Sequence, residues 1–575
     1  MPASECCSGC RSGYKDRTNR IIANVVSQAS ATPRELGRYM PPTVSASGSI
    51  KEPMGVSTTE ERATHGPKGT HGEILKSSAM VGGSQLLNVI VGMVRTKAIA
   101  MMLGPGGFGL FGLYNSISSL VQTLAGMGIN GSGVRQIAAA ASMGEEGRIA
   151  ETSFVLRRVS MALGSLGAGF MIIFARQICW LTFHSHAHVA SVRLLSIAVF
   201  LTLISGAQSA LIQGMRRIAD LAKLQVLGAL AGAVFSIPLV YRYRERGIVP
   251  SLICVAATGI LTSWWFSRKV AVSKMEPAVQ RPDRRMAQEV GALLKLGLAF
   301  MVSSLTTLGV AYAIRIFILR TLGIAATGLY QSAWTLGGFY VGIILQAMGA
   351  DFYPRLTANA HDNQVCNRLT NEQTLVGLVV AGPGVIGSLT LAPLIIALFY
   401  SAKFGPAVGI LRWICLGAFL QIVSFPMGYI IIAKAERALF IACEIAWGIA
   451  SLGLAWYLIP RFGLVGAGAS YFGSYVFHCM MIWTLVRRLS GFRWSRENIK
   501  VGVVTSSLVA IAFSGFAVLP AAFGIAVAAG ALLINTGYAI RVLTTLVDAQ
   551  RVPARARMML SYFRLMRPVA TEAEL

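Results

Sequence analysis

Ionisable side chains inside long apolar segments are the residues most able to do chemistry in this chain. Arg95 and Lys97 lie in an otherwise apolar segment at 78–103, and Arg315 lies in a similar segment at 293–319. A charge at membrane depth is costly, so such residues are candidates for function. Guanidinium groups bind phosphate through paired hydrogen bonds, whereas an ammonium acts as a point charge. The pattern predicts an anion-binding site; the alternative is that these side chains snorkel to the interface, which Lys97 could do easily.

Two carboxylates in apolar surroundings are candidates for carrying a coupling proton. Glu444 lies inside an apolar segment at 438–459, and Asp351 follows the segment at 325–350. Ionisable residues within membrane segments often belong to ion or proton paths. For Glu444 the favoured alternative is structural pairing with an arginine or solvation at the mouth of a cleft. For Asp351 the alternative is an interfacial position.

Uncharged polar residues in the same segments could bind the hydroxyl groups of a sugar. Asn115 lies in the segment at 108–130, and Gln331 lies in the segment at 325–350. Tyr312 and Trp334 could stack on sugar faces. The alternative for each residue is ordinary packing or a hydrogen bond between helices, which is common where helices meet in a membrane.

Motifs for metals, cofactors and hydrolysis give no strong signal. The cysteines at 6–10 read C-C-x-x-C, but no second ligand pair follows at finger spacing. The histidines at 184–188 read H-x-H-x-H, where a wet polar loop is favoured over a surface metal trap. We find no Walker loop, G-x-S-x-G or H-E-x-x-H pattern. We therefore expect no metal, no cofactor, no direct use of ATP and no enzymatic activity.

The composition requires a membrane to surround these residues. Of the 575 residues, 54% are hydrophobic and 13% are charged, about half the usual charged share of ~25%. The mean hydropathy is +0.61. Such a chain cannot cover a soluble surface, and it is too apolar to be disordered. The net charge of +27 is attributed to cytoplasmic loops and an anionic partner rather than to nucleic acid.

Gaps between charges predict an all-α polytopic membrane protein with 12–14 transmembrane helices, and we prefer fourteen. The predicted spans are 78–103, 108–130, 156–175, 193–213, 221–241, 247–266, 293–319, 325–350, 374–399, 406–432, 438–459, 464–486, 500–519 and 522–546. Twelve spans remain possible if the last pair lies in the interface.

The distribution of lysine and arginine predicts both termini in the cytoplasm. Arg242, Arg244 and Arg246 violate this rule, because they fall on the outside between spans five and six. The predicted domains are a disordered cytoplasmic tail at 1–70, a six-helix lobe at 71–290, a second six-helix lobe at 291–490, and a region of two further helices and a basic tail at 491–575.

An internal repeat relates the two lobes. The residues from Leu103 to Phe111 and from Leu322 to Tyr330 both read Leu-Gly-x4-Gly-Leu-aromatic. We call the interval from Leu103 to Leu322 the repeat offset, and the same offset places Ser205 on Ser424. Six spans per unit is an even number, so we expect a parallel repeat of two six-helix bundles with a substrate cleft between them. The alternative is a chance match in a chain rich in leucine and glycine.

The stretch at 94–138 resembles the start of the oligosaccharide-lipid flippases, the O-antigen and enterobacterial common-antigen translocases of the multidrug/oligosaccharidyl-lipid/polysaccharide exporter superfamily. The residues that match the pattern are Gly104, Pro105, Gly107, Gly109, Leu110, Gly126, Gly128, Ile129 and Arg135. The resemblance implies alternating access by two six-helix bundles in the bacterial inner membrane. It implies transfer of an undecaprenyl-pyrophosphate-linked oligosaccharide to the outer leaflet for lipopolysaccharide or surface polysaccharide biosynthesis. The long tail and the two extra helices depart from the usual twelve-span form.

Three hypotheses for function follow. The first is a lipid-linked oligosaccharide flippase whose partners are its substrate, membrane lipids and polysaccharide polymerase or assembly proteins. The second is a multidrug or cation antiporter on the same fold, which should have a cleft dominated by carboxylates and aromatic residues. The third is a membrane glycan polymerase or ligase, which would need a large outside loop. The cations at Arg95, Lys97 and Arg315 favour the first.

Overall fold

The computed structural model describes residues 68–270 and 283–546, and in this part of the chain every regular element is a helix. The predicted tail therefore lies almost wholly outside the described residues, as do residues 271–282 and 547–575. Lys68, Gly69 and Thr70 already belong to the first helix.

The elements are α2 (Lys68–Gly126), α3 (Ile129–Ser142), α4 (Glu146–Ile173), α5 (Ala175–Phe183), α6 (Val189–Gly214), α7 (Ile218–Tyr243), the 3₁₀ turn η1 (Arg244–Gly247), α8 (Ile248–Ser267), α9 (Asp283–Leu322), α10 (Ile324–Ala358), α11 (Asn363–Phe399), the 3₁₀ turn η2 (Ala402–Phe404), α12 (Ala407–Ala433), α13 (Arg437–Ser490), α14 (Arg496–Val518) and α15 (Ala521–Leu546).

Ten helical stretches within the described residues are long and apolar enough to cross a membrane. Three of them, Leu87–Gly126, Ile218–Ser267 and Arg437–Ser490, are about twice the length that one crossing needs. Each of the fourteen predicted spans overlaps one of the helices α2 to α15. The second predicted span ends earlier than expected, at Gly126, because Met127 and Gly128 turn the chain into α3 with positive φ angles of 46° and 66°.

Two sharp backbone breaks separate paired spans without ending the helical run. Gly104 interrupts α2 with φ 65° and ψ −174°, and Gly463 interrupts α13 with φ 57° and ψ −135°. Gly323, between α9 and α10, has φ 87° and ψ 177°. Side chains with a Cβ rarely adopt such angles, so glycine in the two Leu-Gly motifs is required by the reversal of the chain.

The predicted repeat is present in the backbone. Gly104 and Gly323 are related by the repeat offset and share the same conformation. At the other end of the helices, Arg216 and Ala435 are related by the same offset and have φ angles of 53° and 59°. The Ile218 amide donates a 2.8 Å hydrogen bond to the Arg216 carbonyl, and the Arg437 amide donates a bond of the same length to the Ala435 carbonyl. Matching strain at non-glycine positions is improbable by chance, so the structure supports two bundles built on one plan.

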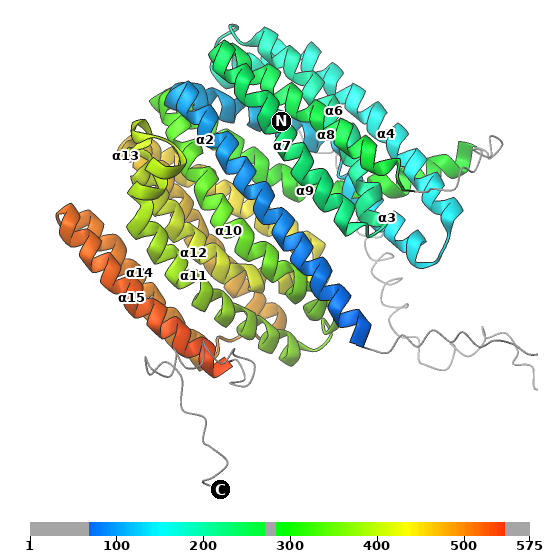
Figure 1. Cartoon of the computed structure of the whole chain (residues 1–575). Coiled ribbons are helices and arrows are strands. Elements are labelled where there is room, and N and C mark those ends of the chain that lie inside the picture. Colours follow the sequence, from blue (N-terminus) through cyan, green and yellow to red (C-terminus); the bar gives the residue numbers. More distant parts are fainter. Residues whose placement is uncertain (1–67, 271–282, 547–575) are drawn as a thin grey trace, which may run out of the picture. The chain divides into compact units, whose positions relative to one another are not determined.

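The first bundle, which we call the N-lobe, comprises α2 to α8, and the second, the C-lobe, comprises α9 to α13. Within the N-lobe α6 packs on α4 and α8, and α7 packs on α2 and α8; within the C-lobe α12 packs on α10, α11 and α13. The lobes meet mainly where α2 contacts α9 and α10 (Figure 1).

The last two helices, α14 and α15, pair with each other and pack on α11 (Figure 1). Arg412 of α12 fixes this contact, because its guanidinium lies 3.7 Å from the centroid of the Phe516 ring in α14 and donates to the Leu389 carbonyl of α11. Large apolar side chains such as Ile173, Trp456 and Leu533 are 71–74% exposed, as expected where helices face lipid.

Candidate functional site

The two lobes touch most closely where the repeated Leu-Gly motifs cross. A methyl group built at Gly109 would overlap the Ile324 carbonyl oxygen, and one built at Gly328 would overlap the Pro105 carbonyl oxygen. The repeat offset relates Gly109 to Gly328 and Pro105 to Ile324, so the contact is symmetric under the repeat. Small residues permit such close packing of helices in membranes. The crossing holds α2 against α10 and positions the residues that follow on both helices.

Arg315 of α9 is a buried cation beside this crossing, and its side chain is only 6% exposed. Its Nε donates a 2.7 Å hydrogen bond to Oε1 of Gln331, and Nη1 donates to the Ala311 carbonyl at 2.9 Å. The guanidinium carbon lies 5.6 Å from the Trp334 ring centroid, within the range of a cation–π contact. Within the described residues no carboxylate forms an ion pair with Arg315. A buried guanidinium with only neutral partners retains the capacity to bind an anion.

Gln331 links this cation to the N-lobe. Its Cγ and Oε1 atoms lie only 2.9 Å from where a Cβ of Gly112 would stand, so the glycine in α2 makes room for the amide. Its Nε2 donates to Thr335 Oγ1 at 3.1 Å. Asn115 follows Gly112 by three positions, on the same face of α2, and is half-buried. The structure therefore brings Arg315 and Gln331 together at the lobe junction, one turn from Asn115.

Arg95 and Lys97 lie in the first half of α2 and are half-buried. The Nε atom of Arg95 is buried and has no hydrogen-bond partner among the described residues. No ion pair or hydrogen bond joins either residue to Arg315 or Gln331 in the part of the chain that the structure describes. The backbone repeat pairs Arg95 with Ile314 and Arg315 with Thr96. A shift of one position turns a helical side chain by ~100°, so the two arginines are not symmetry mates.

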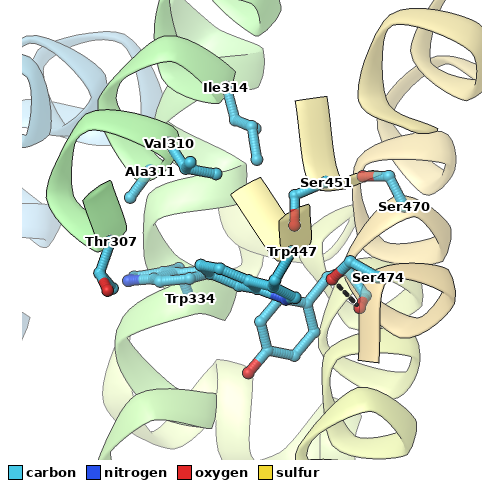
Figure 2. Close-up of a pocket in the computed structure, with 10 residues that line it drawn as sticks. Thr307, Val310, Ala311, Ile314, Trp334, Trp447, Ser451, Ser470 and Ser474 are labelled. Carbon is cyan, nitrogen blue, oxygen red and sulfur yellow. Dashed lines mark hydrogen bonds between the residues drawn. The ribbon is translucent and has the colours of Figure 1, made fainter. Parts of the chain in front are cut away.

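A small cavity lies beside Arg315 inside the C-lobe. Its volume is about 20 Å³, enough for one water molecule. Figure 2 shows Thr307 on α9 facing the serines of α13 across it, with the rings of Trp334 and Trp447 between them. The lining residues are Thr307, Val310, Ala311, Ile314, Trp334, Trp447, Ser451, Ser470, Tyr471 and Ser474.

The polar groups of this cavity are incompletely satisfied. Within the described ranges, Trp447 Nε1 and Ser451 Oγ are buried without a hydrogen-bond partner. Ser470 and Ser474 donate to the carbonyls of Ala467 and Tyr471, each at 2.8 Å, so their oxygens can still accept a bond. A buried polar group without a partner is costly, so the lining is suited to a small polar occupant.

Glu444 lies at one end of this cavity, with its carboxylate Oε2 3.5 Å from the Thr307 hydroxyl. It precedes Trp447 and Ser451 on the same face of α13. Arg315 lies beyond the other end, because Thr307 and Arg315 are about 12 Å apart along α9 at 1.5 Å per residue. The cavity thus separates a carboxylate from a guanidinium. Asp351 belongs to α10, but its side chain lies outside the described residues.

Contacts between the lobes close the end of the bundle that carries the glycine crossing. The Thr182 hydroxyl at the end of α5 lies 2.5 Å from the Tyr312 hydroxyl of α9, and Arg320 donates to the Leu181 carbonyl. The Phe108 ring of α2 packs against the rings of Tyr400 and Phe404, with centroid distances of 5.4 and 5.9 Å. Tyr312, for which sugar stacking and ordinary packing are both open, forms part of this closure.

Sequence reasoning missed the polar lining of the cavity. Ser470 and Ser474 are four positions apart, and Glu444, Trp447 and Ser451 recur at helical spacing. Two polar faces at this spacing in adjacent spans could have indicated the site. The histidines at 184–188 have separate partners: His184 contacts the Trp180 carbonyl, and His188 contacts the Tyr114 hydroxyl at 3.1 Å.

Comparison with known proteins places these features in a family. Residues 74–360 match the family described as polysaccharide biosynthesis protein. The chain is 24% identical over 435 residues to the lipid III flippase of Escherichia coli (strain K12), an alignment that covers 72% of this chain and 99% of that relative.

Solved structures share the fold. The lipid II flippase MurJ in an inward closed conformation aligns with 80% of this chain and 99% of its own length, with a TM-score of 0.60 and 13% identity. An inward-facing multidrug resistance MATE family transporter of the MOP superfamily aligns with 69% of this chain and 94% of its own length, with a TM-score of 0.57 and 15% identity. At these identities the likeness shows the fold alone.

The architecture, the repeat and these comparisons agree. The proteins to which this chain is similar are flippases and other transporters, so the chain is a transporter and not an enzyme. The chain is a multi-pass membrane protein, and its residues 74–360 match the family described as polysaccharide biosynthesis protein.

Proposed function

We propose that the chain is a flippase that moves an undecaprenyl-pyrophosphate-linked oligosaccharide from the inner to the outer leaflet of the bacterial inner membrane. The observation that carries the proposal is Arg315, a buried cation held by Gln331 at the lobe junction without a carboxylate partner among the described residues. A diphosphate is the anionic group of such a lipid, and an arginine fork suits it. The alignment with a lipid III flippase over 99% of that relative's length supports the same substrate class.

The remaining predicted residues have roles in this proposal. Arg95 and Lys97 supply further positive charge in the N-lobe, and the free Nε of Arg95 is available to an anion. Asn115 and Gln331 bind sugar hydroxyls or fix the cations. Both termini face the cytoplasm, and the closed end of the bundle faces outward. The product serves lipopolysaccharide or surface polysaccharide biosynthesis, where a polymerase receives it.

Glu444 is the proposed site of ion coupling. Its carboxylate contacts Thr307, and it lies at the edge of a cavity with unpartnered polar atoms. A proton exchanged at this carboxylate would change the charge near Arg315 and thus favour one lobe arrangement. Asp351 remains the second candidate for the same role.

A second candidate function is a cation exporter. The observation that favours it is the same cavity, which Trp334 and Trp447 line and whose Thr307 contacts Glu444, because aromatic faces and a carboxylate suit a cation. The cavity volume of about 20 Å³ is far below the ~300–1,000 Å³ of drug-sized sites. The flippase therefore remains our first choice.

The test is translocation in proteoliposomes that contain the full chain and a fluorescent undecaprenyl-pyrophosphate oligosaccharide, with and without imposed proton and sodium gradients. Wild-type protein should translocate the lipid, and the double variant Arg95→Ala/Arg315→Ala should not. The matched control is Arg461→Ala, which removes an exposed arginine that donates to the Tyr457 carbonyl and stacks on the Tyr457 ring in its own helix. Absence of transport together with efflux of a cationic dye would instead establish the exporter.

A further inference from the structure

An arginine-rich turn joins α7 to α8 and carries the residues that violate the predicted charge distribution. Arg242, Arg244 and Arg246 are all exposed, and they line an open groove with Met102 and Leu103 of α2. Its volume is about 640 Å³. Glu245 is the single carboxylate in the lining, and no ion pair joins it or any other described carboxylate to the three arginines. The groove therefore has an unbalanced positive charge.

The backbone of this turn is strained at Arg244, which has φ 50° and ψ −127°. The residue related to it by the repeat offset is Gly463, with φ 57° and ψ −135°. A non-glycine residue in such a region costs ~1–3 kcal/mol and is a reason to look for function. The fold thus accepts glycine at this position in one lobe and holds an arginine there in the other.

The strained arginine is anchored to the break in α2. Arg244 Nη1 donates a 2.8 Å hydrogen bond to the Met102 carbonyl, two positions before Gly104. The cation therefore caps the C-terminal end of the first half of α2, where the helix dipole favours positive charge. One bond uses only part of its donor capacity. The turn itself is fixed, because a methyl group at Gly247 would lie 2.5 Å from the Leu239 carbonyl oxygen.

The surroundings of the groove indicate a ligand that belongs to the membrane. Tyr241 and Tyr243 are 65% and 55% exposed, and Met101 is 58% exposed. Exposed tyrosines beside apolar side chains are typical of the boundary between lipid and water. An unbalanced cluster of guanidinium groups at this boundary suits phosphate, which accepts paired hydrogen bonds from arginine. A phosphate held there would be attached to a lipid rather than free in solution.

We infer that the groove lined by Arg242, Arg244 and Arg246 binds the phosphate group of a membrane lipid at the outer leaflet. The site is distinct from Arg315 and does not depend on the proposed transport function. The ligand is either an anionic phospholipid of the bulk membrane or an undecaprenyl diphosphate, and both present the same chemistry to the arginines.

The test is lipid binding to the full chain in detergent micelles, measured by native mass spectrometry. The probes are dioleoyl phosphatidylglycerol, undecaprenyl diphosphate and, as the lipid without phosphate, dioleoylglycerol. The double variant Arg242→Gln/Arg246→Gln should bind both phosphate lipids at least tenfold more weakly and should leave dioleoylglycerol binding unchanged. Addition of Arg244→Gly places glycine where the repeat-related turn has Gly463, so the backbone keeps its conformation without strain. Binding of the phosphate lipids should then weaken further, because the third guanidinium is lost.

The matched control is Arg461→Gln, which removes a cation two positions before the repeat-related break at Gly463 in α13. Unchanged binding in the double variant, or an equal loss in the control, would overturn the inference. Tighter binding of undecaprenyl diphosphate than of phosphatidylglycerol would identify the translocated lipid class as the ligand. Equal binding would identify the bulk phospholipid, and both results support a phosphate site.

Discussion

Replacement of Gly328 by alanine is expected to open the end of the transporter where the lobes cross. The added methyl would overlap the Pro105 carbonyl oxygen and lie 2.8 Å from the Gly109 nitrogen, whereas carbon atoms normally approach to ~3.5–4.0 Å. Overpacking of this kind costs ~1–3 kcal/mol. A cost of that size in the closed arrangement alone shifts the balance between closed and open forms by roughly 5- to 150-fold.

The assay is electron–electron double resonance on the full chain in nanodiscs. Spin labels at Ile173→Cys and Phe462→Cys, which are 72% and 60% exposed, report the distance between the lobes once the nine native cysteines are replaced. Gly328→Ala should shift the distribution to longer distances. Gly338→Ala, in the same helix but with no atom within 4 Å of the new methyl, is the control. An identical distribution in all three proteins would refute the role of the crossing.

Three further predictions concern the closure, the added helices and the coupling site. Tyr312→Phe removes the contact with Thr182 between the lobes. Loss of such a hydrogen bond costs ~0.5–1.5 kcal/mol and should lengthen the same label distance; no change would show that this contact does not hold the lobes. Arg412→Met removes the cation–π contact with Phe516. A contact of this kind contributes ~0.5–2 kcal/mol, so the unfolding temperature of the solubilised protein should fall, whereas an unchanged temperature contradicts that anchoring role. Glu444→Gln should abolish the response of transport to an imposed proton gradient and preserve substrate binding; a normal response would exclude this carboxylate from coupling.

The helices were predictable because charge is so rare in the spans, and the Leu-Gly motifs revealed the repeat because a chain reversal needs glycine there. The repeat-related turn at Arg244 and Gly463 escaped detection. Arg216 corresponds to Ala435 and Arg244 to Gly463, so the residue types differ although the backbone conformations agree. Sequence comparison detects side chains, whereas the repeat is preserved here mainly in backbone geometry.

The sequence indicated candidate residues one at a time but not how they are arranged. The cost of burying a charge identified Arg315, yet its bond to Gln331 depends on how α9 and α10 fold back at Gly323. Arg95 and Arg315 are one position out of step under the repeat offset, so they fall on different faces of their helices. Serines are common in membrane helices, so the cavity lining carried no single-residue signal.

The measurement that tests the account most directly is the translocation rate of an undecaprenyl-pyrophosphate oligosaccharide by Arg315→Gln in proteoliposomes, beside wild type and Arg315→Lys. Loss of hydrogen bonds to a charged group costs ~1.5–3 kcal/mol, so Arg315→Gln should be roughly 10- to 150-fold slower. Arg315→Lys, which keeps the charge but not the fork, should fall between the two. Wild-type rates in Arg315→Gln, with the protein folded and inserted, would contradict the claim that this buried cation binds the translocated anion.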